Sequence, residues 1–141
     1  MIKAIIFDCF GVVLDVRSNY KIEPVVEYIS SLKGQFKLAM LSNVPSRESL
    51  DRRFVEGELD QLFDVVVASG DTGYEKPQPE IYQLTAAQLG VQPDECLFID
   101  DIDRFCEAAD IVGMQTHRFI DPEFSLNELK LKVEGLREHS N

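Results

Sequence analysis

Four short apolar runs recur along this chain, and a helical pattern comes after each of them. They span 2–8, 36–42, 64–68 and 96–100, and a fifth predicted strand spans 114–118. Runs that are apolar almost throughout are typical of strands buried on both faces of a parallel sheet. The predicted helices span 24–33, 46–55, 79–89, 103–111 and about 125–137. This alternation predicts an α/β fold, a doubly wound parallel sheet in three layers with right-handed crossovers and helices on both faces.

The first apolar run ends at a carboxylate, and a glycine follows soon after. In the stretch I-K-A-I-I-F-D-C-F-G, Asp8 closes the run, and Gly11, three positions later, is expected to end the extended conformation. A buried strand has no packing use for a carboxylate, and the carboxyl ends of strands in an open α/β sheet form the ligand crevice. A local role stays open, because such an aspartate is often a helix N-cap or a turn former. Together with three motifs further along, Asp8 is where we expect the chemistry.

A hydroxyl and an amide end the second apolar run. Ser42 and Asn43 come directly after L-A-M-L and precede a predicted helix. A hydroxyl at a strand tip beside a helix start suits the binding of an oxyanion. The structural alternative is that Ser42 or Ser46 caps the helix that carries Leu50.

A lysine lies on a short loop with fixed flanks. Lys76 stands between Gly73 and Pro77, and Pro79 begins the next predicted helix. Proline is pre-organised for the first turn of a helix, so this loop is short and rigid. Most loop lysines are only solvated charges, but these flanks favour a positioned ammonium group.

Two adjacent carboxylates end the fourth apolar run. Asp100 and Asp101 come after C-L-F-I, and neighbouring carboxylates repel each other unless a cation lies between them. Mg²⁺ binds through one or two protein carboxylates and keeps waters and phosphate oxygens as its other ligands. The alternative, an acidic helix start favoured by the helix dipole, suits Asp103 better than Asp100.

In chain order, strand-Asp, strand-Ser, loop Lys-Pro and strand-Asp-Asp resemble the haloacid dehalogenase superfamily of hydrolases. The resemblance spans residues 2 to about 117. It implies the strand order 3-2-1-4-5, which places Asp8 at the centre of the sheet beside Asp100. It also implies an Mg²⁺-dependent phosphohydrolase that forms an aspartyl-phosphate on Asp8.

The same resemblance implies a role for each motif residue. Ser42 and Asn43 would donate hydrogen bonds to phosphoryl oxygens, and Lys76 would stabilise charge. The metal ligands that the resemblance implies are the carboxylates of Asp8, Asp100 and Asp101 and the backbone carbonyl of Phe10.

Phe10 is the largest departure from the family pattern. Phosphatases of this superfamily usually carry a second aspartate there, which protonates the leaving group and then activates water. Loss of a general acid-base typically slows a reaction by roughly 10²–10⁴-fold, and Asp15, Glu75 and Asp103 are the alternative proton donors. An aromatic side chain at this position also resembles the metal-free 2-haloacid dehalogenases, but the pair Asp100 and Asp101 argues against that branch.

The interval between Asp8 and Ser42 is the second departure. Relatives commonly hold a helical cap domain of many tens of residues there, whereas this chain has room only for a linker at 15–23. We therefore expect a single capless domain over 1–141. Either a bulky phosphorylated substrate or a second copy of the chain covers the open site, or the chain is a non-catalytic or truncated domain that binds phosphate and metal.

Net charge and cysteine spacing argue against several classes of partner and site. The net charge of −11 argues against nucleic-acid and anionic-membrane partners, because neutralising phosphates needs clustered Lys and Arg. Cys9, Cys96 and Cys106 show no spacing of a disulfide framework or zinc site. Asp8 interrupts the only N-terminal apolar run, and no run is long enough to span a membrane, so a cytoplasmic location is expected.

Overall fold

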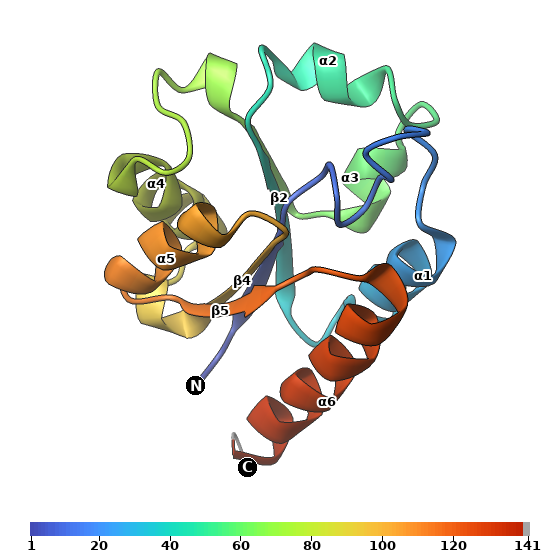
Figure 1. The fold of residues 1–141 in the computed structure, drawn as a ribbon. Coiled ribbons are helices and arrows are strands. Elements are labelled where there is room, and N and C mark those ends of the chain that lie inside the picture. Colours follow the sequence, from blue (N-terminus) through green and yellow to red (C-terminus); the bar gives the residue numbers. More distant parts are fainter. Residues whose placement is uncertain (140–141) are drawn as a thin grey trace.

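The computed structural model describes residues 1–139, which form a five-stranded parallel sheet between two helical layers (Figure 1). The order is β3-β2-β1-β4-β5, which confirms the predicted fold class and strand order. All five strands lie within the predicted ranges. They are β1 (Ala4–Phe7), β2 (Lys37–Ser42), β3 (Val65–Ala68), β4 (Cys96–Asp100) and β5 (Gln115–Arg118).

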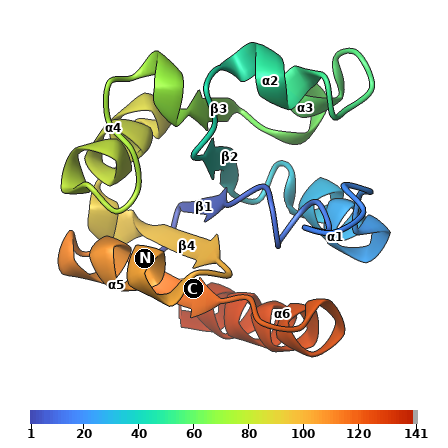
Figure 2. The same ribbon diagram turned by 45° about the horizontal axis from the view of Figure 1, so that its top comes forward.

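Alternate residues of the central strands face two separate hydrophobic layers. Ile5 and Phe7 of β1 pack on one side with α1 (Glu23–Leu32) and α6 (Pro122–His139). Ala4 and Ile6 pack on the other side with α4 (Pro79–Leu89) and α5 (Asp103–Ile111). Figure 2 shows these two helix pairs on opposite faces of the sheet. Since both faces are covered, β1, β2 and β4 are almost wholly buried, which explains why their sequences are continuously apolar.

The predicted helix at 46–55 is shorter and precedes a helix that the sequence analysis missed. The chain forms α2 (Arg47–Asp51), turns, and then forms α3 (Glu58–Leu62). Gly57 separates them with φ 79°, a conformation that favours glycine. The buried side chains of Phe54 and Leu59 anchor this segment on the core.

The other helices begin and end close to their expected bounds. Helix α4 starts at Pro79 and stops at Gly90, whose φ of 75° makes it a left-handed C-cap. Helix α5 has the predicted range, and α6 extends the expected 125–137 at both ends. Two short 3₁₀ turns, η1 (Ser69–Asp71) and η2 (Pro93–Glu95), complete the described elements. No helix of residues 1–139 is both long and apolar enough to cross a bilayer.

A tight turn occupies the interval between β1 and α1. Leu14 and Lys21 form an antiparallel bridge, and the backbone N–H of Asp15 donates to Tyr20 O over 2.9 Å. The Asp15 carboxylate accepts from the backbone N–H groups of Arg17 and Ser18 at 2.9 and 3.0 Å. The described residues between β1 and α1 therefore form a local turn and no additional domain.

Candidate active site

The carboxyl ends of the three central strands bring together residues that are far apart in the sequence. Strand β1 lies between β2 and β4, with Phe7 beside Met40 on one side and Ile99 on the other. Asp8 comes directly after β1, Ser42 ends β2 and Asp100 ends β4. Parallel register alone therefore places them at one edge of the sheet, where the crevice of this fold class lies.

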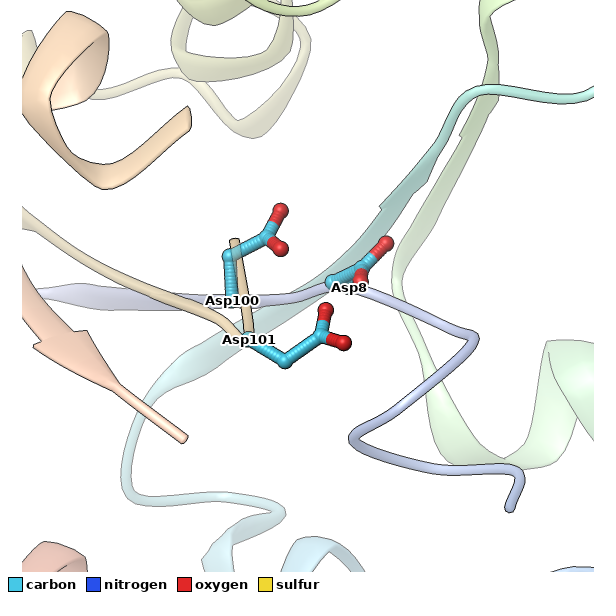
Figure 3. Close-up of side chains that lie close together, drawn as sticks. All are labelled: Asp8, Asp100 and Asp101. Carbon is cyan, nitrogen blue, oxygen red and sulfur yellow. The ribbon is translucent and has the colours of Figure 1, made fainter. Parts of the chain in front are cut away.

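Three carboxylates gather at this edge. Asp8, Asp100 and Asp101 each offer an oxygen atom, and these oxygens lie within 4.8 Å of one another. Figure 3 shows the three side chains close together at the ends of their strands. Burial raises the pKa of Asp8 to about 8, and the charges of Asp100 and Asp101 add to that rise, while Lys76 opposes it. Burial, and then the neighbouring Asp100, likewise raise the pKa of Asp101.

Lys76 binds two of these carboxylates at once. Its Nζ donates to Asp8 Oδ1 over 2.8 Å and to Asp100 Oδ2 over 2.7 Å. The third donor direction is satisfied by Leu41 O at 3.2 Å. Burial lowers the pKa of Lys76, but the charges of Asp8 and Asp100 outweigh burial and raise it. The ammonium is therefore fixed between the two strand-end carboxylates.

The Asn43 side chain holds the Lys76 backbone rather than facing outward. Its Oδ1 accepts from Lys76 N over 2.9 Å, and its Nδ2 donates to Lys76 O over 3.0 Å. This two-bond clasp joins the loop after β2 to the loop after β3. The loop after β3 is therefore positioned by a side chain 33 residues earlier in the chain.

Ser42 and Ser46 have different surroundings. Ser46 is the N-cap of α2, and its hydroxyl accepts from Ser49 N over 3.2 Å. The structural alternative is thus correct for Ser46. Ser42 is 1% exposed at the end of β2, and its hydroxyl forms no hydrogen bond with any residue in the described range.

Asp101 has an oxygen that lacks a protein partner. Its Oδ1 is buried and forms no hydrogen bond with the described residues. A buried carboxylate oxygen without a partner is costly, and a bound cation relieves that cost. Carboxylate oxygens are the ligands that Mg²⁺ prefers. The donor set and the unpartnered oxygen therefore fit a hard divalent cation.

Gly11 was not identified as a site residue by the sequence analysis, although it was noted as the break after the first run. It has φ 90°, and a Cβ at this position would lie 2.3 Å from Asp101 Oδ2. Glycine thus permits both the backbone turn and the approach of the carboxylate. A glycine three positions after a strand-end carboxylate is the signal that could have found it.

Position 10 carries an aromatic ring at the edge of this site. Phe10 is partly buried and packs on the core, and the guanidinium of Arg53 lies over it with Cζ 4.9 Å from the ring centroid. Arg53 was also missed, because nothing near it in the sequence marks it.

The alternative proton donors lie in other surroundings. Asp15 binds the backbone of its own turn. Asp103 is exposed, and its Oδ1 lies 4.0 Å from Arg118 Nη1. Glu75 is exposed. None of the three forms a hydrogen bond or ion pair with Asp8 in the described part of the chain.

All three cysteines are free and buried. Burial raises the pKa of the Cys9, Cys96 and Cys106 thiols to about 12 in each case. The three thiols therefore pack as small core residues.

Comparisons with known proteins point to one family. The family model of haloacid dehalogenase-like hydrolases matches residues 19–109. A phosphorylated carbohydrates phosphatase from Thermotoga maritima is 31% identical over 120 residues, which are 85% of this chain and 53% of that protein. The pyrophosphatase PpaX from Bacillus cereus is 33% identical over 93 residues, which are 66% of this chain and 41% of that protein.

Solved structures share the fold. An enzyme of the same family from Bacteroides thetaiotaomicron, solved in complex with magnesium and inorganic phosphate, has a TM-score of 0.72 at 16% identity. That match covers 84% of this chain and 94% of the other. This chain spans about half the length of the two curated relatives. From its sequence match, its sheet order and its strand-end carboxylates, the chain belongs to the haloacid dehalogenase-like hydrolases.

Proposed function

We propose that this protein is an Mg²⁺-dependent phosphohydrolase in which Asp8 attacks the phosphoryl group and forms an aspartyl-phosphate. The observation that carries the proposal is the Lys76 ammonium held at 2.8 and 2.7 Å between Asp8 and Asp100 beside the unpartnered Asp101 oxygen. A carboxylate nucleophile divides one difficult displacement into two easier steps. The relatives named as phosphatase and pyrophosphatase support the same reaction class.

Each site residue has a distinct task in this proposal. Lys76 aligns the Asp8 carboxylate and offsets its repulsion from an anionic phosphate. Ser42, whose hydroxyl has no partner in the described residues, donates to a phosphoryl oxygen. Asn43 acts through Lys76, because both ends of its amide already bind the Lys76 backbone. This role replaces the direct phosphoryl contact that we expected from the sequence.

The metal would be held at the carboxylate end of the site. Asp8, Asp100, Asp101 and the backbone carbonyl of Phe10 are the proposed ligands. When bound, Mg²⁺ neutralises charge on the phosphoryl oxygens and thereby lowers the barrier to attack by an anion. Lys76 would continue to hold Asp8 and Asp100 in place.

The exposed turn between β1 and α1 bears on the size of the substrate that the protein would accept. Val16 and Tyr20 on the turn at 15–20 are 59% and 78% exposed, and no domain covers them in the described residues. A phosphorylated substrate with a bulky leaving group, or a second copy of the chain, would exclude water from the edge of the sheet that carries the carboxylates. A non-catalytic phosphate-binding domain is the second candidate, and Phe10 in place of an acid is the observation that favours it.

Phosphate release from 4-nitrophenyl phosphate tests the proposal. Turnover is expected with Mg²⁺, is lost with a chelator, and is lost in Asp8→Asn. Asp94→Asn is the matched control, because Asp94 is exposed and forms no ion pair among the described residues. Turnover equal in Asp8→Asn and the native protein would refute the nucleophile.

Two further measurements separate the alternatives. Mg²⁺ is expected to raise the Tm of the native protein and not of Asp101→Asn, which tests the metal site without turnover. Phosphate binding with a Tm shift but no turnover would indicate the non-catalytic domain. Chloride release from 2-chloropropionate that persists with a chelator would indicate the metal-free dehalogenase instead.

A further inference from the structure

Phe10 and Arg53 form a paired aromatic and cationic surface beside the proposed nucleophile. Phe10 lies two residues after Asp8, and its ring is held by packing against the core. The Arg53 Cζ lies 4.9 Å from the centroid of that ring, which is within the range of a cation–π contact. Arg53 is exposed, so its guanidinium is accessible to solvent.

Arg53 differs from the other arginines of its segment. Arg47 pairs with Asp51 and Asp60, and Arg52 pairs with Glu48. Arg53 forms no ion pair or side-chain hydrogen bond with residues 1–139; beyond its contact with Phe10, its guanidinium donors have no protein acceptor. In a chain of net charge −11, a guanidinium without a carboxylate partner is available to an anionic ligand.

Position 10 also lacks a group that can donate a proton. A phenyl ring cannot protonate a leaving oxygen, and Asp15, Glu75 and Asp103 form no hydrogen bond or ion pair with Asp8 in the described chain. An alkoxide leaves poorly without a proton, whereas a carboxylate or a phosphate leaves as a stable anion. A guanidinium binds either of these oxyanions through two parallel hydrogen bonds.

We propose that Phe10 and Arg53 form a leaving-group subsite that selects phosphoryl donors whose leaving group departs as an oxyanion, namely acyl phosphates and phosphoanhydrides. The inference rests on the proposed phosphohydrolase function. Arg53 binds the departing oxyanion, and Phe10 holds the guanidinium in place by its ring face. The specificity of this chain is thus set by two residues of the core domain and not by a cap.

The reaction balances without an acid at position 10. In the first step an Asp8 carboxylate oxygen bonds to phosphorus as the bond from phosphorus to the leaving oxygen breaks. The leaving oxygen keeps the bonding electron pair and remains unprotonated against Arg53. In the second step the oxygen of a water molecule bonds to phosphorus, the Asp8 oxygen recovers its electron pair, and the water proton passes to the phosphate product or to solvent.

Steady-state kinetics on four substrates with Mg²⁺ test this subsite. The substrates are acetyl phosphate, pyrophosphate, 4-nitrophenyl phosphate and glycerol phosphate. We expect kcat/KM for the first two to exceed that for glycerol phosphate by about 100-fold or more, the order of a missing general acid. Phe10→Asp restores a proton donor and is expected to reduce this ratio, by raising kcat/KM for glycerol phosphate.

Arg53→Gln tests the cation separately. It is expected to lower kcat/KM for acetyl phosphate and pyrophosphate by about 10- to 100-fold, as for a lost charge-assisted hydrogen bond. 4-Nitrophenyl phosphate should lose less, because its nitrophenolate spreads charge over the ring. The matched control is Arg52→Gln, an adjacent exposed arginine already paired with Glu48, which should leave all ratios unchanged.

The outcomes distinguish this inference from the function on which it rests. Asp8-dependent turnover of 4-nitrophenyl phosphate with unaltered substrate ratios in Arg53→Gln would overturn the subsite and leave the phosphohydrolase intact. Equal kcat/KM for glycerol phosphate and acetyl phosphate in the native protein would do the same. Absence of any Asp8-dependent turnover would overturn both.

Discussion

Gly11 lies against the Asp101 carboxylate so closely that any side chain at position 11 would displace it. A Cβ there would stand 2.3 Å from Oδ2 and 2.5 Å from the carboxyl carbon. The Asp101 carboxylate can occupy its position only because Gly11, in a neighbouring loop, has no Cβ atom. This contact links the turn after β1 to the end of β4.

Gly11→Ala is therefore expected to weaken Mg²⁺ binding by roughly 10- to 100-fold, the usual effect of disturbing the surroundings of a metal ligand. Calorimetric titration with Mg²⁺ measures this change. Gly34→Ala is the matched control, because Gly34 has a similar φ of 85° but no atom within 4 Å of an added Cβ. Both variants carry backbone strain of about 1–2 kcal/mol, and only the first should lose affinity. Native affinity in Gly11→Ala would show that Asp101 is not a ligand.

Asn43→Ala should reduce both stability and turnover through Lys76. It leaves the Lys76 N–H and C=O without their partners, which costs about 1–3 kcal/mol in the free energy of unfolding. Turnover should fall because the Lys76 ammonium is no longer held on Asp8. Denaturant unfolding and phosphate release measure the two effects. Ser46→Ala, which removes the α2 N-cap at a cost of about 1 kcal/mol, should leave kcat unchanged.

Lys76→Met should destabilise the protein more than any surface lysine variant. It leaves Asp8 and Asp100 buried without their shared cation, and breaking a buried ion pair costs about 3–5 kcal/mol. Lys3→Met is the comparison, since Lys3 pairs with Glu95 at the surface, and such pairs contribute about 0–1 kcal/mol. Unfolding in urea at about pH 7.5 with a chelator present distinguishes them. Equal losses in the two variants would contradict the buried geometry.

His117 should make the protein less stable as the solution becomes acidic. Burial lowers the pKa of His117 below 6.5, Lys132 adds to that lowering, and the contact with Ser125 O at 3.1 Å opposes it. Below about pH 6.5 the unfolded chain therefore binds more protons than the folded chain, so the free energy of unfolding falls as pH falls. Urea unfolding between about pH 7.5 and 5.5 should show a shallower fall in His117→Gln. An identical slope in both proteins would exclude this contribution.

The strand-end residues were predictable because they depend on parallel register. The apolar runs predicted parallel strands whose carboxyl ends lie at one edge, and the family resemblance supplied the order that makes the strands of Asp8, Ser42 and Asp100 neighbours. Helix α4 was predictable for a local reason, since Pro79 starts it and Gly90 stops it. In these cases the determining interactions lie within the element or between neighbouring strands.

The remaining features depend on contacts that the local sequence does not encode. The division into α2 and α3 comes from Gly57 and from core packing of Leu59, neither of which helical periodicity reveals. The clasp of Asn43 on Lys76 joins two loops, and the sequence suggested a direct substrate contact instead. Arg53 contacts the Phe10 ring only because the folded chain brings the segment after α2 beside the turn after β1.

The turn at 15–20 has a consequence for redesign. Its two arms already meet at the bridge between Leu14 and Lys21, so a segment inserted at its tip would leave and re-enter the core at a single point. Doubling the length of such a loop costs only about 0.6 kcal/mol in closure entropy. A foreign recognition module could therefore be grafted there while the sheet and the edge that carries the three carboxylates keep their geometry.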